Sequence, residues 1–266
     1  MKKFILLFML LLSTIVTAKE VENPLTFYKP SYFVFGDEKN QVKHQISFKY
    51  NLIYPFNTGL YFGYTQTSLW KMYDQSAPFL DTNYNPEFFY QFVNGDNIFN
   101  DINLKYISLQ LGFFEHKSNG RPRPESKSLN RSYIQLNLTT GQRLVEMGVS
   151  GRVWYYYTSD RELYNYSGIG EGEIFIQLHN KGNYLDEEKL YVKGGVGGSY
   201  FGKQDRDRNQ LGYSGKNWIE AGLSLRLMSA RIQPYFFINY YHGYNEFMLH
   251  YTEKTEHAVR AGVLFK

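Results

Sequence analysis

A two-residue alternation of apolar and polar side chains recurs along this chain, and it restricts the possible folds more than any other feature. Segment 45–53 shows it clearly, with four apolar side chains on one face: Ile46, Phe48, Tyr50 and Leu52. The same pattern returns in four further segments: 60–70, 130–138, 217–228 and 257–265. Successive side chains of a β-strand point to opposite faces of its sheet, so the alternation predicts an all-β chain.

The aromatic content decides between the kinds of all-β fold. The chain has 25 Tyr and 21 Phe, and aromatic residues make up 18% of it, yet its mean hydropathy is −0.45. Beyond the N-terminal segment there is no apolar run of about 18 residues, so no transmembrane helix is expected. A transmembrane β-barrel places aromatic side chains in girdles at both membrane interfaces and polar side chains inside. The composition therefore favours an antiparallel transmembrane β-barrel.

The number of strands follows from the number of such segments. Six more segments have the character of strands: 86–93, 101–116, 143–157, 171–180, 188–202 and 231–241. Because a bacterial barrel with both ends on the periplasmic side has an even number of strands, we take 26–35 as one more and predict about 12 strands. Short turns such as 57–59 and longer loops such as 203–215 fit periplasmic turns and external loops.

The N-terminal segment has the features of a secretory signal peptide. Two lysines precede an apolar run at 4–12, and the small-residue sequence Val16-Thr17-Ala18 follows it. We therefore expect a signal peptide at 1–18 and a single barrel domain at 19–266, located in a bacterial outer membrane.

A histidine, a serine and an asparagine stand at a spacing that suits nucleophilic catalysis. His116 and Ser118 are two residues apart, so they share one face of a strand, with Cα atoms roughly 6.5 Å apart. The segment between Ser118 and Asn130 is rich in turn formers, and we interpret it as a hairpin loop that returns Asn130 beside His116. These residues would supply a nucleophile, a base and a group that orients the base.

The same three side chains are expected on the outside of the barrel. Asn130 has the parity of Ile134 and Leu136, whose apolar side chains are expected to face lipid. His116 and Ser118 would pair with Asn130 from the neighbouring strand. A catalytic group in that position indicates a substrate that resides in the bilayer.

Two blocks of sequence carry a resemblance to a known family. The first is His116-Lys117-Ser118-Asn119-Gly120-Arg121, followed by Ser126 and Asn130-Arg131. The second comprises Tyr64-Thr65-Gln66, Trp70, Ser76, Pro78-Phe79, Thr82-Asn83-Tyr84 and Pro86. Together they resemble the outer-membrane phospholipase A family, and the resemblance extends across most of the predicted mature chain. The chain departs from the family pattern at Pro122, Pro124 and Leu129, the last of which stands where the family often has Trp.

The resemblance implies a phospholipase with A1, A2 and lysophospholipase activities that acts on membrane phospholipids. By the same resemblance Ser118 is the nucleophile, His116 the base and Asn130 the group that orients the base. The backbone N–H of Gly120 is implied as the oxyanion donor.

A calcium ion (Ca2+) and a homodimeric active form are implied in the same way. The Arg121 carbonyl and the Ser126 hydroxyl would hold the ion together with Ser76 of a second subunit. All three are neutral oxygen ligands, so binding should be weak for a calcium site. A second, acidic calcium site near Asp160 and Glu162 is left unassigned.

Gln66 gives a separate indication of a subunit contact. It has the parity of Leu60 and Phe62, and so it is expected on the lipid-facing side. An amide in hydrocarbon is costly unless it is hydrogen-bonded. Gln66 could lie near the interface and be solvated, but we favour a hydrogen bond across a twofold axis, which matches the dimer contact of the family.

Two alternatives without catalysis are a passive porin or structural barrel, and a soluble periplasmic β-sandwich. The porin explains the composition and the alternation, but it leaves the spacing of His116, Ser118 and Asn130 unexplained. The sandwich must also account for the outward aromatic side chains. No Gly-x-Ser-x-Gly sequence is present, so a soluble α/β-hydrolase is disfavoured.

The remaining residues predict little further chemistry. The chain has no cysteine, and without Lys2 and Lys3 its 29 basic residues become 27 against 25 acidic ones, which does not favour nucleic acid as a partner. Five other histidines show no spacing typical of metal ligands, and we interpret them as solvated or interfacial: His44, His179, His242, His250 and His257.

Overall fold

A computed structural model describes residues 23–36, 41–56, 58–99, 104–142, 144–159, 163–179, 187–199, 212–228 and 232–266. The expected signal peptide at 1–18 lies outside these residues, as do Asp160, Glu162 and most of the predicted loop 203–215. Within the described part of the chain, no helix is long and apolar enough to cross a membrane.

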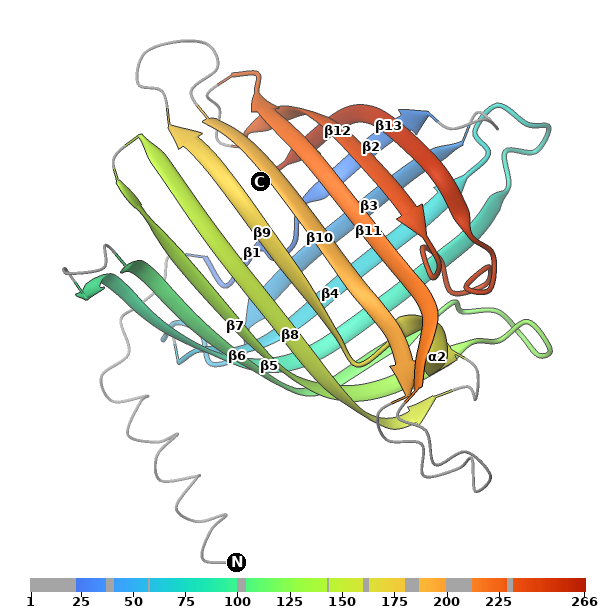
Figure 1. The fold of residues 1–266 in the computed structure, drawn as a ribbon, viewed down its shortest axis with the longest axis horizontal. Coiled ribbons are helices and arrows are strands. Elements are labelled where there is room, and N and C mark those ends of the chain that lie inside the picture. The colour runs from blue at the N-terminus through green and yellow to red at the C-terminus, as the bar shows by residue number, and fades with distance from the viewer. Residues whose placement is uncertain are drawn as a thin grey trace, which may run out of the picture.

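Twelve antiparallel strands close into a barrel, around which they run obliquely (Figure 1). They are β2 (Ser31–Gly36), β3 (Val42–Asn51), β4 (Leu60–Trp70), β5 (Phe79–Phe99), β6 (Leu104–Ser118), β7 (Ser128–Gln142), β8 (Val145–Ser159), β9 (Gly170–His179), β10 (Glu187–Ser199), β11 (Gly212–Arg226), β12 (Pro234–Gly243) and β13 (Thr255–Phe265). Each strand pairs with its neighbours in sequence, and β13 pairs with β2, which closes the sheet. The prediction of an all-β antiparallel barrel with 12 strands is confirmed, and the β-sandwich alternative is wrong.

The predicted strand 26–35 is divided into two pieces, β1 (Leu25–Phe27) and β2, which both pair with β3. The chain leaves the sheet between them at Tyr28, Lys29 and Pro30, and proline has no backbone N–H for the ladder. Inside the barrel, the Tyr28 ring stacks on Phe89 at 5.0 Å, and Lys29 Nζ lies 3.0 Å from Glu87 Oε1. The interruption therefore brings two side chains of the first strand into the lumen.

The two faces of the barrel have opposite character. Apolar side chains cover the outer face, where Ile134 is 53% exposed and Ile174 is 61% exposed. Charged side chains fill the lumen, and Glu87, Glu115 and Arg260 are almost completely buried there. A soluble protein buries its apolar side chains and exposes its charges, whereas a transmembrane barrel has the reverse arrangement.

The segment between β12 and β13, residues 244–254, folds into one end of the barrel together with the short helix α2 (Leu163–Ser167). Its backbone crosses to β5, where the N–H of Met248 donates to Asn83 Oδ1 at 3.1 Å and the N–H of Leu249 donates to Asp81 Oδ2 at 2.6 Å. Four buried apolar side chains from separate parts of the chain pack together there: Leu129, Leu163, Met248 and Tyr251. Packed side chains therefore occupy the lumen at this end of the barrel.

Candidate active site

A bulge in β6 sets the direction of the candidate catalytic side chains. Up to Gly112 the even-numbered residues of β6 face the lumen, but Phe113 and Phe114 are both exposed, and Glu115 is fully buried. The pairing with β7 accordingly shifts by one residue, from Gly112 opposite Tyr133 to Glu115 opposite Arg131. A β-bulge re-aims the side chains that follow it. After the bulge, the even-numbered residues of β6 face outward.

His116 and Asn130 then stand directly opposite each other on β6 and β7. His116 Nδ1 lies 2.8 Å from Asn130 Oδ1, and Asn130 Nδ2 donates to Thr158 Oγ1 at 2.7 Å. Because the amide nitrogen is used toward Thr158, Asn130 offers its oxygen to the histidine, so His116 Nδ1 carries the proton in this arrangement. The other ring nitrogen, Nε2, is left to accept a proton.

Ser118 lies two residues further along the same face, opposite Tyr84 on β5 and Ser128 on β7. Among the described residues, no hydrogen bond joins the Ser118 hydroxyl to the His116 ring. The structure thus brings His116 and Asn130 into contact, and it places Ser118 beside them on the outer face without that bond.

Gly120 lies in the loop after Ser118, and its backbone has a conformation that favours glycine. Its φ is +63°, and a Cβ built there would lie 2.6 Å from Tyr84 Cε2. A side chain at Gly120 would therefore clash with Tyr84 as well as strain the backbone. The Gly120 N–H, which the sequence analysis nominates as an oxyanion donor, lies in this tightly packed turn.

Asn119, which the sequence indicates only as a turn former, holds the loop 119–127 in shape. Its Oδ1 accepts from the N–H groups of Arg121 at 3.3 Å and Lys127 at 2.9 Å. Its Nδ2 donates to the Glu125 carbonyl at 2.8 Å, and the side chain is buried. An Asn inside a turn-rich loop is the usual sign of such side-chain to backbone bonding.

The expected calcium ligands lie on two neighbouring loops at this end of the barrel. The Arg121 guanidinium donates to the Leu80 carbonyl at 3.0 Å, which ties the loop 119–127 to the start of β5. Ser126 is half-buried on the returning limb of the same loop. Ser76 is exposed on loop 71–78, with φ +65°. Among the described residues, no hydrogen bond joins Ser76 to Arg121 or Ser126 within one chain.

Gln66 and the candidate nucleophile Ser118 belong to one row of residues that pair from strand to strand across the sheet. Ile46, Gln66, Tyr84 and Ser118 are paired in that order across β3, β4, β5 and β6. Neighbouring strands are about 4.8 Å apart, so Gln66 lies roughly 10 Å from Ser118 on the outer surface. Within the single chain, the Gln66 amide already accepts from Tyr64 Oη at 3.0 Å and donates to Ser68 Oγ at 3.4 Å. These two bonds use only one of the two N–H donors of the amide, and the role of Gln66 in a dimer stays a prediction.

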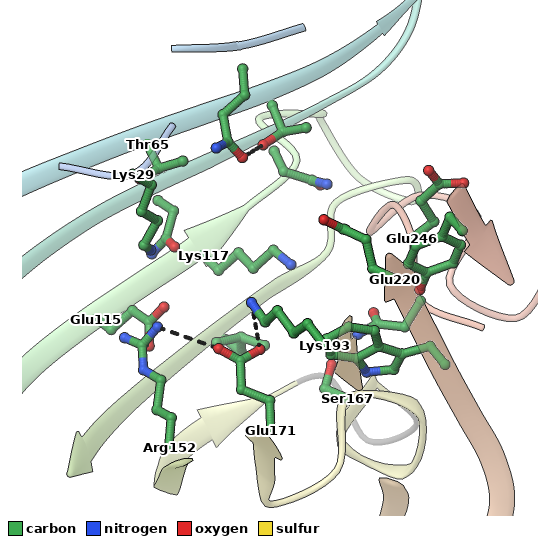
Figure 2. Close-up of a pocket in the computed structure, with 18 of the residues that line it drawn as sticks. Lys29, Thr65, Glu115, Lys117, Arg152, Ser167, Glu171, Lys193, Glu220 and Glu246 are labelled. Carbon is green, nitrogen blue, oxygen red and sulfur yellow. Dashed lines mark hydrogen bonds and ion pairs between the residues drawn. The ribbon is translucent and has the colours of Figure 1, made fainter. Parts of the chain in front are cut away.

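A buried ion-pair network lies in the lumen, and Figure 2 shows two of its members, Glu115 and Arg152. Arg131 binds Glu115 through two bonds, from Nε to Oε2 at 2.6 Å and from Nη2 to Oε1 at 3.0 Å. Arg152 Nη2 lies 3.3 Å from Glu115 and 3.2 Å from Glu87. The Glu115–Arg131 pair occupies the rung next to His116 and Asn130, so a strong ion pair inside supports the pair of strands that carries the outer site.

The fold and the site together define a membrane-spanning β-barrel with a serine, histidine and asparagine on its lipid-facing side. A model of the family described as Phospholipase A1 matches residues 6–191 of this chain. The match covers more than half of the chain, which therefore belongs to the phospholipase A1 family. The predictions of this family, of an enzyme and of an outer-membrane barrel are confirmed.

Individual relatives agree with the family assignment. The putative phospholipase A1 of Neisseria meningitidis serogroup B is 34% identical over 178 residues, which cover 61% of this chain and 44% of that protein. Phospholipase A1 of Escherichia coli K12 is 29% identical over 218 residues, or 69% of this chain and 70% of that protein. This chain thus spans less than half the length of the Neisseria relative.

Solved structures share the fold. Outer membrane phospholipase A from Escherichia coli superposes with a TM-score of 0.69 at 23% identity, covering 96% of this chain and 97% of the other. The Salmonella typhi outer membrane phospholipase, described as a dimer with bound calcium, gives a TM-score of 0.69 at 23% identity and covers 96% of each chain.

Proposed function

We propose that this protein is a calcium-dependent phospholipase that hydrolyses acyl ester bonds of phospholipids and lysophospholipids in the outer membrane. The observation that carries the proposal is the His116–Asn130 hydrogen bond beside Ser118 on the lipid-facing surface. A non-enzymatic barrel gives no reason for this arrangement, because polar side chains that face lipid cost free energy. Membership of the phospholipase A1 family supports the same substrate class.

In the proposed reaction, Ser118 Oγ attacks the acyl ester carbonyl of the lipid, and His116 Nε2 takes its proton. His116 then returns that proton to the leaving alcohol, and a water molecule repeats the sequence to release the fatty acid. Asn130 keeps the proton of the neutral imidazole on Nδ1, and Thr158 keeps the Asn130 amide in its orientation. A neutral orienting group suits this surface, because a carboxylate facing hydrocarbon would be costly to desolvate.

The Gly120 N–H is the proposed donor to the oxyanion that forms on the substrate. The hydrogen bonds of Asn119 fix the loop, so the donor needs no rearrangement when negative charge develops. Loss of one donor of this kind typically costs ~2.7–4 kcal/mol of transition-state stabilisation.

The residues around this loop fit a calcium ion. The Arg121 carbonyl and the Ser126 hydroxyl are hard oxygen donors, which calcium prefers, and both belong to the loop that Asn119 holds together. When bound, calcium supplies positive charge beside the oxyanion. Ser76 of a second copy is the proposed further ligand, since it is exposed and has no hydrogen bond with Arg121 or Ser126 within its own described chain.

A homodimer is accordingly the proposed active form. Gln66 lies in the same row as Ser118, on the outer face that a second copy would cover. The Salmonella typhi structure, described as a dimer with bound calcium, supports this assembly by analogy. We further propose that residues 1–18 are a signal peptide and that 19–266 form one domain.

The decisive test is phospholipid hydrolysis by the refolded barrel in mixed micelles, with calcium and with chelator. We expect release of fatty acid only with calcium, and no release from Ser118→Ala, whose barrel should still show heat-modifiable migration on gels. Sulfonyl fluorides should label the unmodified protein at Ser118. Full activity of Ser118→Ala, or no activity of a correctly folded and calcium-loaded protein, would leave only the porin or structural-barrel alternative.

A further inference from the structure

Two histidines and a glutamate meet on the outer surface of the barrel, away from the candidate active site. His242 is near the end of β12, and Glu256 and His257 are near the start of β13. A ring nitrogen of each histidine and a carboxylate oxygen of Glu256 lie within 4.8 Å of one another. The register between these strands shifts between Tyr241 and Gly243, which puts His242 opposite both residues of β13. The spacing in the sequence could not reveal this cluster, because the pairing of two strands creates it.

Each histidine of the cluster has one ring nitrogen already engaged. His242 Nδ1 bonds to the Glu256 backbone carbonyl, and His257 Nδ1 lies 2.9 Å from Tyr240 Oη. Among the described residues, neither Nε2 atom has a hydrogen-bond partner. Metal-binding histidines are often held in this way, with an oxygen partner on the nitrogen that does not bind the metal, so each Nε2 is the candidate ligand. His242 approaches the Glu256 carboxylate through Nδ1, which lies 4.0 Å from Oε2, so its ring must turn for Nε2 to reach a shared ion. Tyr240 is not one of the three candidate ligands, and its hydrogen bond to His257 orients the ring of that histidine.

We propose that His242, Glu256 and His257 form a binding site for a divalent transition metal such as Zn2+, Cu2+ or Ni2+. Imidazole nitrogen is a preferred ligand of these ions, whereas calcium prefers six to eight oxygen ligands. Three protein ligands leave a fourth tetrahedral position for water. Bonds of about 2.0–2.2 Å bring tetrahedral ligands to about 3.3 Å from each other. The three ligand atoms lie within 4.8 Å of one another, so the side chains must move closer together.

The side chains have the freedom that this closure needs. Glu256 is 64% exposed, and its carboxylate has an exchangeable partner in Lys254, at 3.0 Å. The two imidazole rings are stacked, with centroids 4.8 Å apart and planes 27° from parallel, so a modest rotation changes the direction of their free nitrogens. Binding would therefore link β12 to β13 where their regular ladder is interrupted, at the base of segment 244–254.

The site is separate from the proposed phospholipase chemistry. β12 is six strands from β6 in the closed order of twelve, so the cluster lies on the opposite side of the barrel from His116 and Ser118. The proposal therefore does not depend on the proposed function, and hydrolysis should not change when the cluster is altered.

Calorimetric titration of the refolded full chain with Zn2+ in detergent and without calcium tests the proposal. We expect saturable binding of one ion per chain, and at least a tenfold loss of affinity in His242→Ala and in His257→Ala. Glu256→Gln should weaken binding less. His250→Ala is the matched control, since His250 lies in segment 244–254 but outside the cluster, and it should bind Zn2+ normally. Calcium should neither bind at this site nor compete there.

Two further measurements keep the outcome clear. Cu2+ electron paramagnetic resonance should show two nitrogen ligands in the unmodified protein and in His116→Ala, which removes the one histidine of the active site. Far-UV circular dichroism and heat-modifiable migration should show that the His242 and His257 variants still fold. The proposal is overturned if Zn2+ binding is absent, if it survives both substitutions in folded barrels, or if it is lost in His116→Ala.

Discussion

Asn130 is the residue on which the geometry of the candidate site depends most. Its side-chain oxygen faces His116 Nδ1 at 2.8 Å, and its nitrogen donates to Thr158 at 2.7 Å. An isolated amide could turn its oxygen and nitrogen around, and it would then no longer hold the proton of His116 on Nδ1. The donation to Thr158 favours one of these orientations. Thr158 is therefore a positioning residue that acts through Asn130.

This chain of hydrogen bonds predicts a graded loss of turnover. His116→Ala should be close to inactive, because it removes the base, whereas Asn130→Ala should lower kcat but keep measurable turnover. Thr158→Val removes one neutral hydrogen bond, worth about 0.5–1.5 kcal/mol, so kcat should fall roughly 2- to 10-fold with little change in KM. Ser132→Ala, on the same outward face of β7, is the control and should behave normally. Near-normal rates in both His116→Ala and Asn130→Ala would contradict the assigned roles.

The sequence is sufficient to predict some of these contacts and not others. The spacing of His116 and Asn130 around a turn-rich segment predicts their pairing, and the two residues are partners in the structure. Thr158 could not be found, because regular alternation in β8 puts Tyr155 and Tyr157 outward and would turn Thr158 toward the lumen. Ser118 shares the outward face with His116 as their spacing predicts, but no hydrogen bond joins the two side chains in the described chain, since spacing along a strand fixes the face and not the rotamers.

At the scale of elements, two irregularities flank the strand that carries Asn130. One extra residue at Phe113–Phe114 in β6 turns His116 outward, and one at Tyr157 in β8 turns Thr158 outward. Bulges are common next to active sites because they re-aim side chains without disturbing the rest of the sheet. Both bulges lie beside the rung of Asn130, so the site depends on three strands together.

The same pair of strands is held from inside by Glu115 and Arg131, which predicts a large effect on stability. Arg131→Met leaves the carboxylate of Glu115 buried with a weakened set of partners, and removal of one partner of a buried ion pair typically costs ~3–5 kcal/mol. Urea unfolding in detergent measures this cost, and kcat should fall as well because the next rung carries His116. Glu115→Gln combined with Arg131→Met should be milder than Arg131→Met alone.

Lys189→Met is the matched control for this prediction. Lys189 pairs with Glu173 at 3.3 Å, but both side chains are a quarter or more exposed. Exposed pairs contribute about 0–1 kcal/mol, so this variant should be almost neutral. The supporting role of the Glu115–Arg131 pair is wrong if both variants lose the same small amount of stability.

The strands themselves were predictable where alternation is regular and not where function or turns interrupt it. Segment 60–70 coincides with β4, because Leu60, Phe62 and Tyr64 alternate with Gly63, Thr65 and Thr67 over most of it. β5 extends over Phe79–Phe99 and not only 86–93, since Asp81 and Asn83 obscure the pattern before Pro86. Asp81 and Asn83 are polar there because they hold the segment 244–254 in the lumen. Likewise, β11 begins at Gly212, inside the predicted loop 203–215.

At the scale of the whole molecule, segment 244–254 connects β12 and β13 to β3 and β5. Glu246 is bound by Lys43 at 2.9 Å and by Arg260 at 2.7 Å, while the neighbouring Met248 reaches β5. Burial alone would raise the pKa of Glu246, but Lys43 and Arg260 outweigh it and lower this pKa to about 2. The segment is therefore anchored by a carboxylate that must be ionised.

This anchor predicts a loss of stability in acid. The folded pKa of Glu246 lies below the ordinary value of 4.5, so the stabilisation is complete above about 4.5 and is lost as the pH falls toward about 2. Unfolding midpoints in detergent should decline across this window, and Glu246→Gln should be less stable at neutral pH but decline less on acidification. Glu253→Gln, in the same segment, is the control. An equal acid response in Glu246→Gln and the unmodified protein would exclude this anchor as the cause.

Assembly gives the last prediction, because the proposed calcium site takes Arg121 and Ser126 from one copy and Ser76 from another. Ser118→Ala supplies an intact Ser76 but no nucleophile, whereas Ser76→Ala supplies a nucleophile but weakens the calcium site of its partner. In a mixed dimer, one site combines its own Ser118 with the partner's intact Ser76. Mixing the two inactive proteins in detergent that allows exchange should therefore restore activity, and chelator should remove it. If the calcium site is shared, one of the two sites in every mixed dimer must be complete. If crosslinking proves that heterodimers form and the mixture still stays inactive, Ser76 therefore acts within its own barrel or supports folding.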